Sequence, residues 1–313
     1  MPVLFLRPRV EYDSNGLHRA VRVMRQGDRV MRVAAGDRNR TDAFWGKRSA
    51  VAGASGEPCL MAFVECCIRG LDALADSFGH DPVTLAKWVR RVMTSLAEPV
   101  HGFEGTAVAF FPGGFSAFFS DPDCARQACT AALGMVAAAE MLNRTSDPPV
   151  AIGIGIATSI GILGDFGTED HPLIAGIGQG ANVAAALAKF SAVYGVPMLA
   201  GPTVHDAAEP HFALLQVDTL CNSDGQTAPL DTLLTPPLTR GHPKFLALRA
   251  FHGHILEACR ERQWQRAREK IAQARALSGA NAVLYDLYLE RIAHYERHPP
   301  AADWSGALVE VQI

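Results

Sequence analysis

Apolar and polar positions alternate along residues 1–36, as in the run 17–23, and turn signals such as Asn15-Gly16 interrupt the alternation. This pattern predicts a few half-exposed strands. Residues 37–58 shift to Gly, Ser, Asn, Arg and Asp, with Phe44-Trp45 as a hydrophobic pair. That composition is typical of a linker. The sequence therefore predicts a small β-rich segment over 1–36 and a linker over 37–58.

The middle of the chain, residues 59–235, combines short apolar runs with helical periodicity. A buried strand is expected at 59–64, and a long helix from Asp81-Pro82. Pro112-Gly113-Gly114 separates two apolar runs, 107–111 and 115–119, and has the residue types of a tight hairpin turn. The other expected elements are a helix at 124–143, a strand at 150–157 with its partner from Gly161, a helix at 182–194, and strands at 196–200 and 212–217. This order predicts an α+β, ferredoxin-like sandwich.

Helical periodicity dominates residues 236–313. Amphipathic helices are expected at 245–277 and 281–297, joined at Ser278-Gly279, so that the chain ends in a helical hairpin. Two antiparallel helices cannot hide this much apolar surface from water by themselves. We therefore expect the tail to pack on the preceding domain or on a second chain, with Trp264 as a buried anchor.

Composition places the chain among ordinary globular proteins. Its 313 residues are 49% hydrophobic and 19% charged, which suits about two domains. The net charge of −3 is too balanced to give the whole molecule a nucleic-acid or membrane footprint. Residues 1–58, however, hold eleven Arg or Lys against six Asp or Glu. One hypothesis is an Arg-rich segment that binds an anionic partner, but its arginines alternate with acids, which favours a solvated strand face over nucleic-acid binding.

Cysteine usage and hydropathy indicate the compartment. The seven cysteines are odd in number and lack metal-site spacing, and the first residues, MPVLFLRPRV, do not form a secretory signal. No apolar stretch reaches the length of a bilayer span, and the nearest, 131–139, stops at Glu140. We expect a cytoplasmic protein without a membrane span.

Short motifs across residues 59–235 occur in the order in which one protein family has them. Ile68-Arg69-Gly70 follows the first expected strand, and Ala117-Phe118-Phe119 closes the hairpin. Further matches lie at 131–135, 152–158, 164–168, 177–185 and 194–197. Together they resemble the class III nucleotide cyclase domain of bacterial adenylate and guanylate cyclases. The tail, through residues such as 262–267, resembles the tetratricopeptide-like hairpin that follows this domain in bacterial membrane-sensor cyclases.

The resemblance implies a chemistry. In the family, two aspartates hold two divalent ions that promote attack of the ribose 3′-hydroxyl on the α-phosphorus. Their positions fall here on Cys67 and Gly113, and neither residue type is a good ligand for Mg²⁺. In a shifted register Glu65 would replace the first aspartate, but it is a weak metal candidate because the second ligand is still absent.

The nucleotide-recognition positions differ as well. The family's base-reading lysine and aspartate fall on Ala109 and Gln179, and its transition-state arginine falls on Ala186. Residues 218–223 stand where a phosphate-binding lysine is expected. Asn182, which orients the ribose in the family, is retained, and we interpret it as a capping or loop side chain. We expect no intact catalytic residue, and at most a vestigial nucleotide-binding role for Asn182 and Gln179.

These positions predict a degenerate cyclase homologue that serves as a binding or regulatory module in intracellular signalling, without a cofactor. Family domains pair head to tail, so the resemblance implies a homodimer or a heterodimer with a cyclase-like domain, and the tail is a possible site for a protein partner. The alternative is an active or partner-dependent adenylate or guanylate cyclase that uses Glu65 with Asp165 or a partner's carboxylates. Only this alternative requires Mg²⁺ or Mn²⁺.

Overall fold

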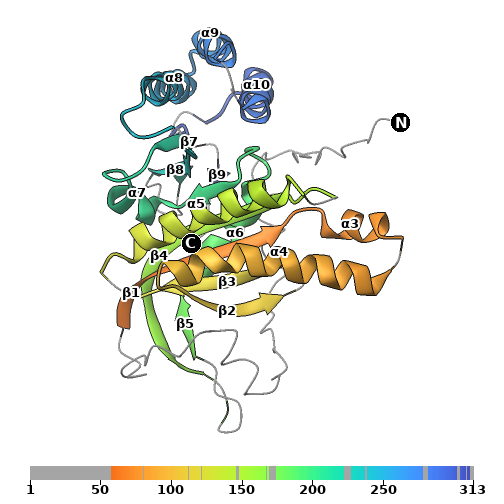
Figure 1. Ribbon diagram of the computed structural model, residues 1–313. Helices are drawn as coiled ribbons and strands as arrows, with labels where there is room; N and C mark the ends of the chain where they lie inside the picture. Colours follow the sequence, from red (N-terminus) through yellow and green to blue (C-terminus); the bar gives the residue numbers. More distant parts are fainter. Residues whose placement is uncertain are drawn as a thin grey trace.

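The computed structural model describes residues 58–310 apart from gaps at 80, 112, 121, 146–147, 167, 169–173, 222–226, 237, 278–280, 302–303 and 308. The predicted β-rich segment over 1–36 and the Arg-rich segment with its proposed anionic partner lie outside the described residues, as does the predicted linker over 37–58 apart from Pro58, which is the first residue of a strand. Figure 1 shows a mixed sheet with helices packed on it and a helical tail at one end.

One sheet runs through the described body. Its strand order is β2-β3-β1-β4-β6-β8-β7-β9, and β5 pairs with β4. The central strands β1 and β4 run antiparallel, from the pair Pro58↔Ile162 to the pair Ile68↔Ile152. The strands are β1 (Pro58–Ile68), β2 (Thr106–Phe111), β3 (Gly114–Phe119), β4 (Ile152–Asp165), β5 (Ile174–Gly178), β6 (Met198–Ala200), β7 (Leu214–Cys221), β8 (Thr227–Leu233) and β9 (Val309–Glu310).

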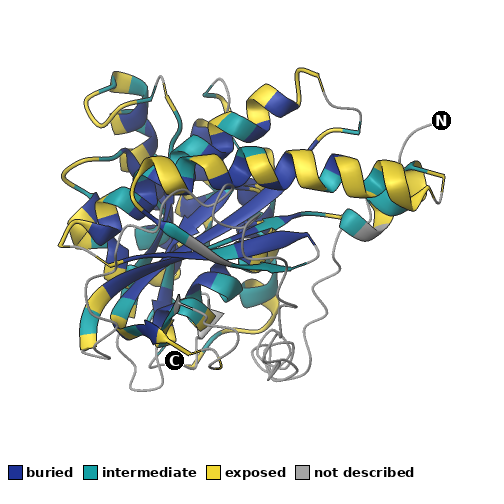
Figure 2. Ribbon diagram, turned by 60° about the horizontal axis from the view of Figure 1, so that its bottom comes forward, coloured by how far each residue is buried: buried dark blue, intermediate teal, exposed yellow. Residues whose placement is uncertain are grey.

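Two long helices cover one face of this sheet (Figure 1). α4 (Pro82–Gly102) begins after Asp81, whose carboxylate accepts hydrogen bonds from the backbone N–H groups of Val83 and Thr84 at 3.0 and 3.3 Å. α5 (Cys124–Leu142) presents an alanine-rich inner side. Side chains that point to this face from β1, such as Val64 and Cys66, form the main core with both helices, which Figure 2 shows in dark blue. The predicted α+β sandwich is confirmed.

The opposite face of the sheet carries α6 (Gln179–Phe190). Gly153 and Gly155 of β4 let this helix approach: a Cβ atom at Gly155 would lie 1.9 Å from the carbonyl oxygen of Ala184, and one at Gly153 would lie 2.5 Å from that of Ala188. The helix expected over 182–194 spans 179–190 instead, so it begins three residues earlier and ends four residues earlier than expected. Two short helices that the pattern did not predict, α3 (Leu71–Ser77) and α7 (Pro202–Ala208), complete the body.

The strand after α5 differs from the sequence prediction. Gly161 was expected to begin a new strand, but β4 continues through it to Asp165, and its partner is β5. The physical reason is crowding: a Cβ atom at Gly161 would lie 2.8 Å from the Met61 sulfur and 2.9 Å from the carbonyl oxygen of Ile177. This glycine permits close strand and side-chain packing instead of marking a turn.

The tail contains three helices, so the predicted two-helix hairpin is wrong in this respect. α8 (Pro243–Arg260) and α9 (Trp264–Arg275) are separated because Arg262 adopts a left-handed φ of 58°, and α10 (Ala282–Arg297) follows. The break was not predicted because no glycine or proline marks it. Trp264 is half-buried and stacks on Tyr295 at a ring distance of 6.0 Å, so it is not the fully buried anchor that we expected.

The tail packs on the body, as the excess of apolar surface predicted. Ile255, Ile271 and Leu284 join Leu199 and Val217 of the sheet in one buried cluster. A buried ion pair with an additional hydrogen bond lies within the cluster. Arg291 of α10 donates to the Asp218 carboxylate of β7 at 2.6 Å, and Tyr194 donates its hydroxyl to the same carboxylate at 2.5 Å. No helix among the described residues is long and apolar enough to cross a membrane.

Candidate functional site

The end of β1 brings together the two positions where the resemblance places metal ligands. Cys67 pairs across the sheet with Gly114, and the backbone N–H of Ile68 donates to the carbonyl oxygen of Gly113 at 2.6 Å. Cys67 and Gly113 are therefore neighbours, as two ligands of a shared metal centre have to be. Neither carries a carboxylate.

Local chemistry makes both positions unsuited to a hard cation. The Cys67 thiol donates to the carbonyl oxygen of Gly153 at 3.4 Å, and burial raises its pKa above the usual range, so it stays protonated at neutral pH. Gly113 has a left-handed φ of 84°, and a Cβ atom there would lie 2.9 Å from Leu71 Cδ2. A side chain at 113 would thus meet backbone strain and an apolar neighbour.

Glu65 is the carboxylate of β1 nearest to this point, two residues before Cys67 and on the same face of the strand. It lies opposite Ser116 of β3, whose hydroxyl donates to the Glu65 carboxylate. Burial raises the pKa of Glu65, while Ser116 and the charge of Lys189 on α6 partly offset this effect. Cys67, and not Glu65, lies beside the hairpin turn.

These residues do not fit a two-metal centre. Mg²⁺ requires oxygen ligands in near-octahedral geometry, and two-metal sites need carboxylates that bridge or face both ions. Within the described part of the chain, no group of three or more His, Cys, Asp and Glu side chains lies close enough to hold a metal ion. A single hydrogen-bonded glutamate, a protonated thiol and a glycine cannot supply the required donor set.

Asp165, the second carboxylate of the active-cyclase alternative, lies far from Glu65. Glu65 pairs with Gly155 of β4, and Asp165 stands ten residues further along the same strand, roughly 30 Å away at the usual rise per residue. The structure therefore does not bring Glu65 and Asp165 together within one chain.

The remaining nucleotide positions lie mostly on α6. Gln179 and Asn182 are exposed in the first turn of the helix, and Ala186 is half-buried one turn further on. α6 begins three residues before Asn182, with Gly178 at its N-cap and no side-chain cap, so Asn182 lies within the helix and is neither the capping nor the loop side chain that we expected. Ala109 lies on the edge strand β2. This arrangement offers no guanidinium or ammonium group at the positions of the family's arginine and lysine.

Three side chains near the end of β1 were not identified from the sequence. Ser116 and Lys189 partly offset the rise in the pKa of Glu65, as described above, and Arg69 connects two segments of the fold by hydrogen bonds. The Arg69 guanidinium donates to Ser191 Oγ and to the carbonyl oxygen of Val196, both at 2.6 Å. It joins the end of β1 to the turn after α6. The retained Ile68-Arg69-Gly70 motif thus has a structural role in this chain.

Comparisons with known proteins agree with this architecture. No protein-family profile and no curated protein matches the sequence. Among solved structures, a bacterial light-regulated adenylyl cyclase is similar over 63% of this chain and 58% of its own, with a TM-score of 0.50 and 15% sequence identity. The adenylyl cyclase CyaB from P. aeruginosa has a TM-score of 0.49 and 15% identity over 59% of this chain and 98% of its own. The guanylyl cyclase Cya2 has a TM-score of 0.48 and 18% identity over 59% and 99%.

At such low identity the similarity concerns the fold. The body of this chain has the α+β architecture found in an adenylyl cyclase structure.

Proposed function

We propose that this chain is a cyclase-fold module that binds a partner instead of cyclising a nucleotide. The observation that carries the proposal is the pair of neighbours Cys67 and Gly113, which stand where the family resemblance places both metal-binding aspartates. Nucleotide cyclisation needs the divalent ions to activate the 3′-hydroxyl and to neutralise the leaving pyrophosphate. Without their ligands the fold retains a surface for recognition but little means of catalysis.

A product assay tests this part of the proposal. Purified full-length protein with ATP or GTP and Mn²⁺ should form no cyclic nucleotide above a heat-inactivated control. Calorimetric titration of the same sample with each nucleotide reports separately whether the fold still binds one. Product that disappears in a Glu65→Ala variant would instead support the partner-dependent or active cyclase.

The proposed partner is a second copy of this chain, in keeping with the dimers that the family resemblance implies. An apolar face on β1, β4 and β5 supports this. It consists of Leu60, Ile160, Ile162 and Ile177, and we call it the β4–β5 apolar face. Leu60 pairs with Ile160 and Ile162 pairs with Ile177 in adjacent registers, so the four side chains are contiguous. Ile160 and Ile177 are 64% and 55% exposed, and burial of such a face favours association.

Sedimentation velocity of the full-length chain tests the dimer. We expect association at micromolar concentration, and an Ile177→Asp substitution should remove the part of it that runs through this face, because a carboxylate would be desolvated at the contact. Leu246→Asp on α8 is the matched control, because Leu246, like Ile177, is an exposed aliphatic side chain but lies outside the β4–β5 apolar face. A heterodimer with another cyclase-like domain is the conclusion if the isolated chain does not associate through this face.

A further inference from the structure

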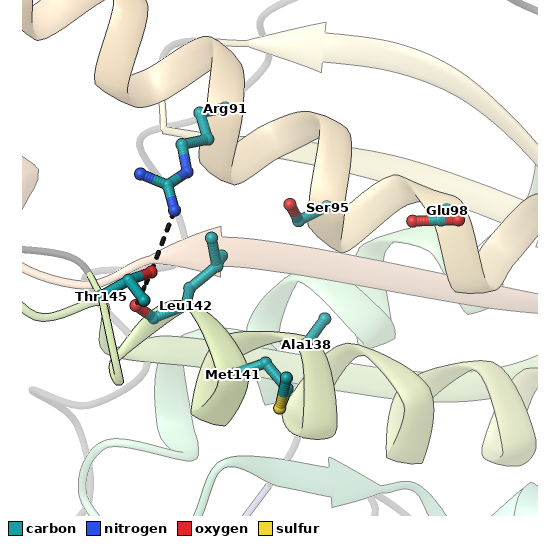
Figure 3. A pocket seen from close by; sticks show the side chains of 7 residues that line it. All are labelled: Arg91, Ser95, Glu98, Ala138, Met141, Leu142 and Thr145. Carbon is teal, nitrogen blue, oxygen red and sulfur yellow. Dashed lines mark hydrogen bonds between the residues drawn. The ribbon is translucent and has the colours of Figure 1, made fainter.

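A groove lies between α4 and α5 on the outer side of the helical layer (Figure 3). The two helices touch closely near Gly134, where a Cβ atom would lie 2.8 Å from Pro99 Cβ. At the other end, Arg91 Nη2 donates to Thr145 Oγ1 at 3.0 Å. Between these contacts the groove has a volume of about 350 Å³.

The groove has an apolar side and two opposite charges on its rim. Ala138 and Leu142 of α5 face α4 across the groove (Figure 3), and Met141, a large apolar side chain that is 58% exposed, lies at its edge. Arg91 and Glu98 of α4 stand along the rim on either side of Ser95. The two charges are seven positions apart, which is about two helical turns, or roughly 10 Å along the axis. An occupant that fits must carry an anionic and a cationic group at this spacing beside an apolar surface.

Helix α4 itself carries this pattern in reverse. A two-fold axis through the point between Thr94 and Ser95 superposes α4 on an antiparallel copy of itself. It places Arg91 against Glu98 of the second copy, and Glu98 against Arg91 of the second copy. Such an isologous contact is self-complementary by construction. The small side chains Thr94 and Ser95 at the axis allow the helices to approach within ordinary packing distance.

We propose that this groove is a second self-association face, in which α4 of one copy packs antiparallel on α4 of another. Charge complementarity between Arg91 and Glu98 sets the register, and the exposed Met141 adds adaptable apolar surface at the edge of the contact. The proposal is independent of the β4–β5 apolar face. A chain with both faces associates beyond the dimer, and a chain with either face alone forms dimers.

The experiment is sedimentation velocity on full-length chains in the Ile177→Asp background, which removes the β4–β5 contact. We expect a dimer there at low salt. Arg91→Glu makes the rim wholly acidic and Glu98→Arg makes it wholly basic. Each single variant should therefore self-associate about tenfold more weakly, because two like-charge pairs replace two opposite pairs. An equimolar mixture of the two variants should form a heterodimer, and a chain with both substitutions should dimerise again.

Matched controls separate this effect from a general change of charge. Arg90→Glu and Glu140→Arg make the same charge changes at exposed positions of α4 and α5 outside the groove, and they should leave association unchanged. Met141→Lys obstructs the groove without altering Arg91 or its bond to Thr145, so it gives the same test if Arg91→Glu proves unstable in thermal melts. A monomeric Ile177→Asp background, or failure of the mixed variants to associate, would overturn the proposal. Association of the Ile177→Asp chain that is lost in each charge-reversal variant, and regained when the two variants are mixed, would establish it.

Discussion

Replacement of Arg291 by methionine should weaken the packing of the tail on the body and lower the free energy of unfolding. Arg291 belongs to α10 and pairs with Asp218 of β7, with its Nη1 2.6 Å from the carboxylate oxygen. The Asp218 side chain is fully buried and that of Arg291 is 11% exposed. Burial alone would lower the pKa of Arg291, but contact with Asp218 and Tyr194 raises it above the usual range. The variant therefore leaves a buried carboxylate without its cation.

The size of the effect follows from what remains around Asp218. In the variant, the carboxylate keeps hydrogen bonds from the Tyr194 hydroxyl at 2.5 Å and from the Thr219 N–H at 2.7 Å, but no opposite charge. Removing one partner of a buried ion pair typically costs about 3–5 kcal/mol. We expect a loss of about 3 kcal/mol in the free energy of unfolding, because these two bonds compensate part of the desolvation.

Urea denaturation followed by tryptophan fluorescence measures this loss, since Trp264 reports on the tail and Trp88 on the body. The double variant Asp218→Asn with Arg291→Met removes both charges and should recover much of the stability, because a neutral buried pair carries no unpaired ion. A single variant that unfolds at the wild-type midpoint would refute the reasoning that this ion pair holds the tail in place.

Three further substitutions probe the core, the candidate site and the packing of α6. Burial lowers the pKa of His252 to about 4, so the stability that neutral His252 contributes is present above the ordinary histidine pKa near 6.5 and is lost as the pH falls. Between pH 7 and pH 4 the free energy of unfolding of the wild type, measured in urea titrations, should fall by about 3 kcal/mol more than that of His252→Gln. An equal dependence of this free energy on pH in the two proteins would contradict the prediction. Burial raises the pKa of Glu65, so its contribution is present at acid pH and is lost as the pH rises; Glu65→Gln should therefore stabilise the protein at pH 8 and have little effect at pH 4, and the reverse order would argue against a buried, costly carboxylate. Gly155→Ala should cost about 3 kcal/mol or more in thermal unfolding, because its Cβ atom would lie 1.9 Å from the Ala184 carbonyl oxygen, whereas Gly241→Ala, with no atom within 4 Å, should be nearly neutral.

Local patterns in the sequence were sufficient for the elements whose signals are local. The helix after Asp81 was predicted from a capping residue, a proline and a helical period, and all three act within a few residues. The hairpin of β2 and β3 was predicted from its turn residues in the same way. Long-range crowding could not be predicted from the sequence. Gly161 is a residue type common in turns, and only the packing of Met61 and Ile177 around it shows that it lies inside a strand.

The candidate site divides along the same line. The family resemblance located Cys67 and Gly113, and the sheet register brings them together. Lys189 and Ser116 could not be found from the sequence, because each meets Glu65 through folding of segments far apart along the chain. The break at Arg262 was equally hidden, since a left-handed arginine has no signature in periodicity. Periodicity predicts which face a residue occupies, but not which distant side chain it meets.

Binding of Mn²⁺ in the presence of ATP tests the central claim most directly, namely that the end of β1 lacks a two-metal centre. The electron paramagnetic resonance signal of Mn²⁺ with ATP broadens when a protein immobilises the ion in an ordered site. We expect full-length protein, at a concentration on the order of 100 μM that would reveal even weak binding, to leave this signal as it is with nucleotide alone. A signal that the protein changes with a defined stoichiometry, and that Glu65→Ala restores to that of the free complex, would contradict the claim and place a metal ion at Glu65.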